Sequence, residues 1–337
     1  MRGIAADVGG TKTLLAVVEP GPDGRPHVLA RRRYASAEWE DPYRLLADFA
    51  AAEPAARGAE AACLAVAGPV ETAGDGQRAR VTNLPWRLEG AAVARALGVP
   101  RARLVNDFEA VVHGLDALAP AGLETLQPGE PCPGAPRAVI GAGTGLGMAA
   151  AVPAADGWRV LPSEGGHADF APADAEQAAL AEWLRERLGR VTAEHVLSGP
   201  GLGRILDFLC AREGAQPGPA LAAALAAGDR AAAIGRAALA GEDPLAVRAV
   251  ELFVRIYGAR AGDLALLLLA RGGVYVAGGI APRLAPFFRA GGFLEAFRAK
   301  PPMEALLAAM PVHLVLDPEA GLLGAGRLAL ALAAAPR

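Results

Sequence analysis

Short apolar runs alternate with longer amphipathic stretches along most of the chain. The apolar runs predict strands over residues 3–8, 14–19, 27–34, 62–67, 79–82, 102–106, 137–142, 147–152, 273–277 and 312–316. Helical patterns predict helices over residues 42–52, 89–97, 107–118, 174–189, 202–212, 219–239, 243–271 and 320–333. Strands at the start, then strand–helix alternation and a mostly helical half, are typical of an α/β protein. Two stretches rich in Gly, Pro and charge, 71–78 and 127–136, are predicted surface loops.

Two glycine-rich loops each lie between two predicted strands. They read "DVGGTKT" at 7–13 and "GAGTGLG" at 141–147, and this strand–loop–strand echo suggests a duplicated fold unit. Small residues let backbone N–H groups approach an anion, and the hydroxyls of Thr11 and Thr144 can add donors. Neither loop has the spacing of a P-loop or of a dinucleotide-binding motif. The pair therefore favours phosphate binding over the alternative, two tight hairpins.

Two further features lie beside predicted strand ends. Asp7 ends the first strand, where it can hold a hydrated Mg²⁺ or, alternatively, cap the turn. Gly278 and Gly279, in "VYVAGGIAPR", follow a β-branched strand. Adenosine is the candidate ligand for that glycine pair, and close strand–helix packing is the alternative.

Polar side chains on predicted loops supply the donors and acceptors that a sugar needs. Four of them have a plainer alternative: helix capping for Asn106 and Asp107, a structural hydrogen bond for His167, and an ordinary helix-start acid for Glu194 in "AEHVLSGPG". A Glu and a His on one Gly-Gly turn, in "SEGGHADF", nevertheless make a better polyol clamp than either alone. The candidate sugar ligands are Asn83, Asn106, Asp107, Glu164, His167 and Glu194.

Composition excludes several other classes of protein. The chain has 337 residues and a net charge of −3 with acids and bases interspersed, which predicts no recruitment by nucleic acid or membrane. The run Arg31–Arg33 is predicted to be a solvated edge strand. Cys63, Cys132 and Cys210 are far apart in the sequence, as expected of reduced thiols in the cytoplasm. The leucine run at 264–270 is far shorter than the roughly 20 residues that span a bilayer.

The chain resembles the bacterial ATP-dependent glucokinases, which share the ribonuclease-H-like fold of actin and hexokinases. The resemblance runs nearly end to end, through "DVGGT", "TNLPW", "NDFEA", "GAGTGLG", "EGGHADFAP", "AEHVLSGPGL", "VAGGIAPR" and "GLLGAG" in family order. It implies a two-domain α/β fold with an interdomain cleft. The small domain would be residues 1–108, completed by the C-terminal helix 318–337, and the large domain residues 109–317.

The resemblance also implies residue roles. Asp107 matches the catalytic base, and Asn106, Glu164, His167 and Glu194 match the glucose ligands. Lys12 stands where this family usually has Asn. Lysine is commoner at that position in the related repressor/open-reading-frame/kinase (ROK) sugar kinases, but their cysteine-rich zinc motif is absent from this sequence. The nucleotide residues are expected to be Asp7, Gly9, Gly10, Thr11, Lys12, Gly141, Gly143, Thr144, Gly145, Gly278 and Gly279, with Asp7 holding Mg²⁺ through water.

The implied reaction is phosphoryl transfer from Mg·ATP to the 6-hydroxyl of glucose. Mannose and fructose stand as alternative acceptors, and ADP and polyphosphate as alternative donors. A non-catalytic sugar-sensing regulator or a chaperone-like ATPase on the same fold is the alternative from another class. Because the first strand is predicted to begin by residue 3, we expect no DNA-binding segment before it, and the intact Asp107 favours catalysis. We expect a cytoplasmic homodimer whose small-molecule partners are glucose and ATP.

Overall fold

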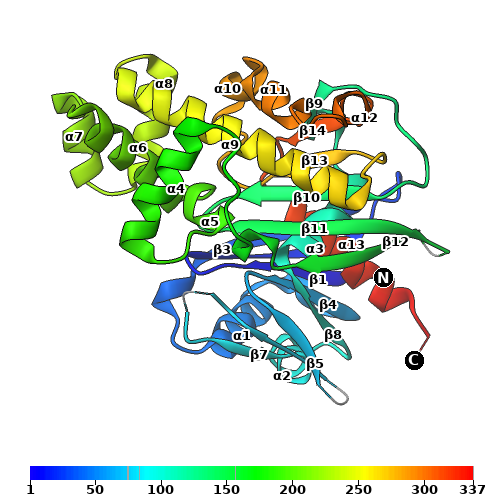
Figure 1. Cartoon of the computed structure of the whole chain (residues 1–337). Helices are drawn as coiled ribbons and strands as arrows, with labels where there is room; N and C mark the ends of the chain where they lie inside the picture. Colours follow the sequence, from blue (N-terminus) through cyan, green and yellow to red (C-terminus); the bar gives the residue numbers. More distant parts are fainter. Residues whose placement is uncertain (74–75, 83, 156, 337) are drawn as a thin grey trace. The chain divides into compact units, whose positions relative to one another are not determined.

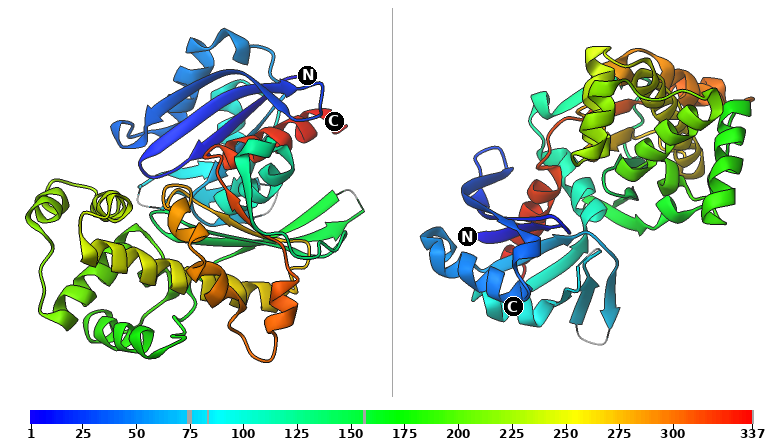
Figure 2. Two further views of the ribbon diagram at one scale, coloured as in Figure 1. Left: turned by 90° about the horizontal axis from the view of Figure 1, so that it is seen from above. Right: turned by 90° about the vertical axis from the view of Figure 1, so that its left-hand side faces the viewer.

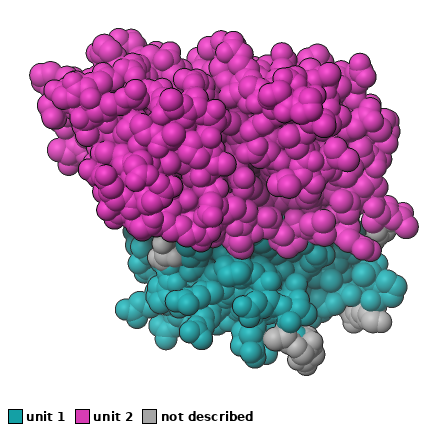
Figure 3. Space-filling view, viewed as in Figure 1, with its two compact units in different colours: residues 1–119, 317–337 teal, residues 120–316 magenta. Residues whose placement is uncertain are grey.

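The computed structural model describes residues 1–73, 76–82, 84–155 and 157–336. Two compact units divide the chain (Figure 3). Unit 1 comprises residues 1–119 and 317–337, and unit 2 comprises residues 120–316. Each unit carries its own sheet, its own helices and its own buried core (Figures 1 and 2).

Unit 1 is built on a five-stranded sheet of β1 (Gly3–Val8), β2 (Lys12–Pro20), β3 (Pro26–Ala35), β4 (Ala61–Val66) and β8 (Ala102–Asn106). Its strand order is β3-β2-β1-β4-β8, with β1 antiparallel to β2 and parallel to β4. Successive side chains of β1 enter different cores, Ile4 on one face and Ala5 on the other. Burial on both faces explains why this strand reads as a continuous apolar run.

The remaining elements of unit 1 are α1 (Pro42–Ala52), α2 (Gly90–Leu97), α3 (Asp107–Gly114), α13 (Ala320–Ala334) and a small sheet of β5 (Val70–Ala73), β6 (Gly76–Arg80) and β7 (Arg87–Glu89). The small sheet corrects the prediction of a loop over 71–78. Its hairpin is polar and mostly exposed, so no apolar alternation marks its strands.

The C-terminal helix fixes the position of α3 in unit 1. Both views of Figure 2 show α13 (red) against the strands coloured blue to cyan. A Cβ added to Gly324 would lie 1.7 Å from the carbonyl oxygen of Ala110, so only glycine permits this approach of α13 to α3. Gly324 of "GLLGAG" thus serves helix packing, and that packing holds the helix that begins at Asp107.

Unit 2 is built on a six-stranded sheet of β9 (Leu123–Gln127), β10 (Arg137–Ala142), β11 (Leu146–Ala154), β12 (Gly157–Ser163), β13 (Val274–Ala277) and β14 (Val312–Val315). Its order is β12-β11-β10-β13-β14-β9. The hairpin β10–β11 and the parallel neighbour β13 repeat the arrangement of β2, β1 and β4. The structure therefore shows the duplicated unit that the sequence echo suggested.

The helices of unit 2 are α4 (Ala175–Leu188), α5 (Ala193–Val196), α6 (Gly199–Glu213), α7 (Pro219–Ala226), α8 (Arg230–Ala240), α9 (Pro244–Leu268), α10 (Ala285–Arg289), α11 (Gly292–Arg298) and α12 (Glu304–Ala308). The long helix α9 runs beside β10 and β13 (Figure 1). Its buried face, which includes Phe253 and Tyr257, forms the centre of the unit 2 core.

Several predicted elements need correction. The helix predicted over 219–239 is two helices, because Gly228 has φ +158° and Asp229 caps α8. The helix predicted over 107–118 ends as an α-helix at Gly114. The edge strands β9 and β12 were not predicted, since neither presents a continuous apolar run. The run Arg31–Arg33 does lie on an edge strand, β3, as predicted.

The structure also gives the state of the cysteines and bears on metal sites and membrane-spanning helices. All three cysteines are free thiols, and burial raises the pKa of Cys63 to about 12. Within the described residues, no group of three or more His, Cys, Asp or Glu side chains forms a metal site. No helix in this part of the chain is both long enough and apolar enough to cross a membrane.

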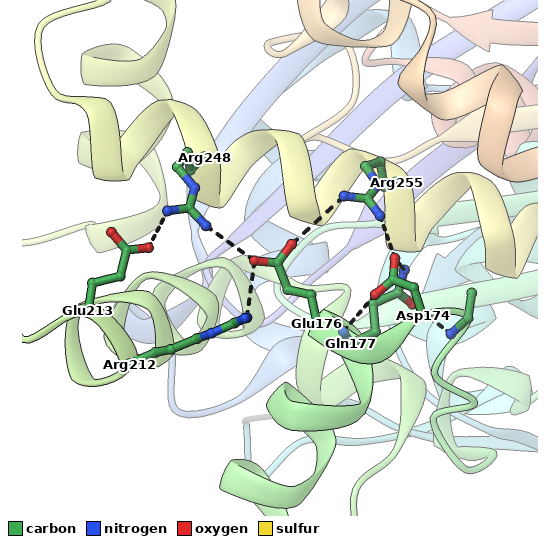
Figure 4. Close-up of polar contacts among 8 residues, drawn as sticks. Asp174, Glu176, Gln177, Arg212, Glu213, Arg248 and Arg255 are labelled. Atoms are coloured by element: carbon green, nitrogen blue, oxygen red, sulfur yellow. Dashed lines mark hydrogen bonds and ion pairs between the residues drawn. The ribbon is translucent and has the colours of Figure 1, made fainter.

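An ion-pair network joins three helices of unit 2 (Figure 4). Glu176, near the start of α4, lies 3.3 Å from Arg212, 3.2 Å from Arg248 and 3.8 Å from Arg255. Arg255 also pairs with Asp174, the N-cap of α4, and Arg248 pairs with Glu213. Because one carboxylate serves guanidinium groups from α6 and α9, the network holds both helices to α4 (Figure 4).

We expect Glu176→Gln to lower the free energy of unfolding by about 1 kcal/mol, because three guanidinium groups lose their shared carboxylate. The loss should shrink in 1 M salt, where the screening length falls to about 3 Å. Thermal denaturation at low and high salt measures both effects. Glu182→Gln is the control, because within the described residues Glu182 pairs only with the exposed Arg185. Equal losses in the two variants would contradict a special role for the network.

Candidate functional site

The two glycine loops are the tips of equivalent hairpins. In the first, the N–H of Gly9 donates to the Lys12 carbonyl at 3.0 Å, and in the second, the N–H of Gly143 donates to the Gly145 carbonyl at 2.8 Å. The next two N–H groups in each loop, at Gly10 and Thr11 and at Thr144 and Gly145, have no acceptor among the described residues. Each tip therefore presents two adjacent backbone donors on a closed turn, which is the arrangement that binds phosphate oxygens.

Buried hydroxyl groups hold the first loop. Ser36 is fully buried, donates from its Oγ to the Gly9 carbonyl at 2.8 Å, and donates its N–H to the Thr11 carbonyl at 3.1 Å. Its Oγ also lies 3.0 Å from Oγ1 of the buried Thr13. The sequence prediction missed both residues. The two hydroxyls give the loop a fixed conformation without occupying its free N–H groups.

Asp7 lies at the end of β1, directly before the first loop. Burial raises the pKa of its carboxyl group, and the charge of Lys12 partly offsets that shift. Within the described residues the carboxylate accepts no hydrogen bond, so the turn-capping alternative has no bond to support it. A half-buried carboxylate without a hydrogen-bond donor fits a divalent cation, because hard cations prefer oxygen ligands.

The carboxylate of Glu194 holds the end of the second glycine loop. Its Oε2 accepts the N–H of Leu146 at 2.9 Å, directly after the loop. A Cβ on Gly145 would lie 2.5 Å from the same Oε2, whereas a Cβ on Gly143 would meet nothing within 4 Å. A side chain at position 145 would therefore displace the carboxylate of Glu194. This contact is more specific than the ordinary helix-start role that was the alternative for Glu194.

The amino end of α6 also contacts the second loop. The N–H of Gly199, the first residue of α6, donates to the Gly143 carbonyl at 2.8 Å. Ser198 caps the helix through the N–H of Gly201 at 3.1 Å. The positive end of a 15-residue helix therefore lies against the loop, where it favours an anion. The sequence marks this helix start with Ser, Gly and Pro, but its contact with the loop comes from tertiary packing.

The turn of "SEGGHADF" carries Glu164 and His167. The Ser163 hydroxyl accepts the Gly165 N–H at 3.0 Å, and Nη2 of Arg260 donates to the Gly165 carbonyl at 3.1 Å. The side chains of Glu164 and His167 are exposed, and the Glu164 carboxylate makes no hydrogen bond or ion pair within the described residues.

The same turn lies close to the second glycine loop through Glu194. Nδ1 of His167 lies 3.9 Å from Oε1 of Glu194. A short antiparallel bridge between Asp169 and Thr192 ties the turn to the segment that carries Glu194. The structure thus brings three of the predicted sugar ligands, all in unit 2, to one place beside the second loop.

Asn106 and Asp107 lie at the start of α3 in unit 1. Oδ1 of Asn106 accepts the Phe108 N–H at 2.9 Å, and its Nδ2 donates to the Gly68 carbonyl at 3.1 Å. Asn106 is therefore the N-cap of α3, which was its alternative interpretation, and its sugar contact stays a prediction. Asp107 follows in the first turn, half-buried, with Oδ1 accepting the Phe108 N–H at 3.0 Å.

The remaining predicted residues are placed as follows. Gly278 and Gly279 follow β13, and the next residue, Ile280, donates its N–H to the Ala142 carbonyl at 3.2 Å. The second glycine loop and this glycine pair are therefore neighbours. Gly141 lies within strand β10 rather than in the loop, and Lys12 is exposed at the start of β2. Asn83 lies outside the described residues.

A family model described as Glucokinase matches residues 4–332. This chain belongs to the glucokinase family. A glucokinase of Nostoc sp. (strain PCC 7120) is 40% identical over 342 residues, which cover 98% of this chain and 99% of that protein. The family, and with it the enzyme class of hexose kinases, confirms what the motifs predicted.

Solved glucokinase structures share the fold. A glucokinase from an Antarctic psychrotroph is 28% identical, with a TM-score of 0.81 over 97% of this chain and 98% of that chain. The glucokinase of Balamuthia mandrillaris, solved in complex with glucose, is 26% identical, with a TM-score of 0.79 over 97% of this chain and 93% of that one. The predicted fold class, the α/β fold of these sugar kinases, is confirmed.

We expect Gly145→Ala to raise the Michaelis constant for glucose about tenfold, a change of roughly 1.4 kcal/mol. The added Cβ would displace the Glu194 carboxylate, which is the predicted sugar ligand. Gly143→Ala is the matched variant, because its Cβ meets open space, and it should affect the constant for ATP alone. Steady-state kinetics with each substrate varied in turn make the comparison. Identical glucose constants in the two variants would separate Gly145 from the sugar site.

Proposed function

We propose that this chain is a glucokinase that transfers the terminal phosphoryl group of Mg·ATP to the 6-hydroxyl of glucose. The observation that carries the proposal is the pair of hairpin tips, each with two adjacent backbone N–H groups that lack an acceptor among the described residues. The family match and a relative solved with glucose support the choice of acceptor. Phosphoryl transfer depends mainly on positioning and charge neutralisation, which these loops can supply.

In the donor half of the reaction, the residues of the two tips bind phosphate oxygens. Gly10 and Thr11 donate from the first loop, and Thr144 and Gly145 donate from the second. The positive charge of Lys12, at the edge of the first loop, adds to the attraction. The amino end of α6 contributes its dipole beside Gly143. We place adenosine against Gly278 and Gly279, beside the second loop.

Asp7 is the candidate ligand for the divalent ion, through a water molecule. Mg²⁺ bound with ATP would neutralise charge that develops on the phosphates. Asp7 contributes a carboxylate that no donor of the described chain engages, directly before the first loop. The charge of Lys12 opposes the effect of burial on the pKa of this carboxylate, and burial remains the larger of the two effects.

In the acceptor half, Asp107 takes the proton from the 6-hydroxyl. A primary alcohol is a weak nucleophile at neutral pH, so a carboxylate within reach of its proton lowers the barrier. The side chains of Asn106, Glu164, His167 and Glu194 bind other hydroxyls and orient the ring, together with Asn83. Binding energy from hydroxyls remote from the reaction then assists catalysis.

We further propose that the enzyme works as a cytoplasmic homodimer. The predicted domains, 1–108 with 318–337 and 109–317, remain a prediction about which parts of the chain close around substrates.

A coupled assay with glucose, mannose, fructose and N-acetylglucosamine, each with ATP, ADP and polyphosphate, tests the proposed substrates directly. The highest kcat/KM should be with glucose and ATP, and turnover of no sugar would overturn the proposal.

We expect Asp107→Asn to lower kcat by about 10² to 10⁴, the usual contribution of a general base. The change keeps shape and hydrogen bonding, and Asn106 rather than Asp107 caps the helix, so α3 should remain folded. Kinetics, calorimetric glucose binding and thermal denaturation on one preparation separate catalysis from folding.

The control for that experiment is Glu109→Gln, in the same helical turn. Glu109 forms an ion pair with Arg103 at 2.9 Å, so its loss should reduce stability while kcat stays within a few-fold. A folded Asp107→Asn variant that kept more than about a tenth of the wild-type kcat would exclude the general-base role.

Asp7→Asn should lower kcat by at least about tenfold and raise the Mg²⁺ concentration needed for half-maximal rate. It should also stabilise the protein at pH 8. The folded-state pKa of Asp7 is raised, so above that pKa its buried charge opposes folding, and the amide removes this effect. The gain in Tm should shrink as the pH falls through the raised pKa. Unchanged magnesium dependence would leave Asp7 without a metal role.

A further inference from the structure

The hydroxyl group of Tyr257 lies where two strands of the unit 2 sheet stop pairing. β10 and β13 pair in parallel as far as Gly141 and Ala277. One residue further, the Ala142 N–H donates to the Tyr257 hydroxyl at 2.8 Å. The hydroxyl oxygen also lies 3.3 Å from the Ile140 carbonyl and 3.4 Å from the Ala277 carbonyl, either of which can accept its proton.

Both strands enter proposed nucleotide loops directly after this point. Ala142 precedes Gly143, and Ala277 precedes Gly278. Gly278 has φ +83°, and a Cβ there would lie 2.5 Å from the Ala142 carbonyl oxygen, so the backbones of the two loops are in contact. The Tyr257 hydroxyl therefore takes the place of a strand partner for the Ala142 N–H. It does so at the point where β10 and β13 separate into the two loops.

Tyr257 itself is fixed from the other side. It lies on α9, is fully buried, and makes edge-to-face contacts with Phe253, Phe288 and Phe293 at centroid distances of 5.9, 5.6 and 6.0 Å. Such contacts hold an aromatic ring in one orientation. A fully buried side chain touches no ligand, so any effect on nucleotide binding must pass through the backbone that it holds.

We propose that Tyr257 is a positioning residue for the donor half of the site. Its hydroxyl fixes the end of β10 relative to β13, and thereby sets the loop 143–145 against the glycine pair 278–279. The inference rests on the proposed function, because it assigns ATP to these two loops. Its consequence is specific: loss of the hydroxyl disturbs nucleotide binding and leaves the exposed sugar residues Glu164 and His167 unaffected.

The test uses Tyr257→Phe, which keeps the ring and its aromatic contacts but leaves the Ala142 N–H without an acceptor. We expect the dissociation constant of Mg·ATP, measured by calorimetry, to rise at least about fivefold, since an unsatisfied buried donor is costly enough to shift the loop. The dissociation constant of glucose should stay within twofold. Hydrogen exchange should show faster exchange of the Ala142 amide than in the wild type.

Phe253→Leu is the matched control. It removes a ring from the same cluster, so it should lower Tm at least as much, but the strand junction keeps its hydrogen bonds. Its affinity for ATP should equal that of the wild type at a temperature where both variants are folded. Equal weakening of ATP binding in both variants, or wild-type ATP affinity and Ala142 exchange in Tyr257→Phe, would overturn the proposal.

The binding measurements separate this proposal from the proposed function. A wild-type protein that binds ATP but phosphorylates no sugar would overturn the proposed function, while the comparison of ATP affinities still decides the role of Tyr257. A wild-type protein that binds no ATP would overturn both.

Discussion

Backbone N–H groups bind a polyanion well only when they are left without internal acceptors and are still held in place. In both hairpins the first glycine closes the turn and the next two N–H groups stay unpaired among the described residues. Side chains elsewhere supply the rigidity: Ser36 under the first loop, and Glu194 and Tyr257 under the second. Much of the structure around the loops consists of such supports, because a tip made of small residues cannot fix itself.

The supports also connect the two halves of the proposed reaction. Glu194 accepts the N–H that follows the second loop and lies 3.9 Å from His167, so one carboxylate contacts both the second glycine loop and the turn that carries His167. A sugar hydroxyl bound to Glu194 would change the electron density on the same group that holds the loop. Arg260, which donates to the Gly165 carbonyl from α9, ties the turn to the helix that carries Tyr257. The proposed donor and acceptor residues of unit 2 are therefore held by separate hydrogen bonds to the same helix.

The sequence predicted the parts of the fold that physical periodicity marks. β1, β4 and β10 are buried on both faces and read as apolar runs, whereas the edge strand β12 and the polar hairpin β5–β6 carry no such signal. The prediction joined α7 and α8 because alanine fills both helices, although Gly228 and Asp229 mark the break between them. The motifs located the loops and turns of the site. They could not reveal Ser36 or Tyr257, whose roles arise only when distant segments pack together.

The duplication explains how two similar hairpins can take different roles. Asp7 and Gly141 are the fifth residues of the six-residue strands β1 and β10, each paired with a hairpin partner and a parallel neighbour. The backbone is thus repeated while the side chain at this position changes from a carboxylate to hydrogen. Two carboxylates facing the phosphates would repel them, and none would leave a divalent ion without a protein ligand. In the proposed chemistry, one acid and one glycine would leave both loops able to donate to phosphate and would give the cation a single carboxylate.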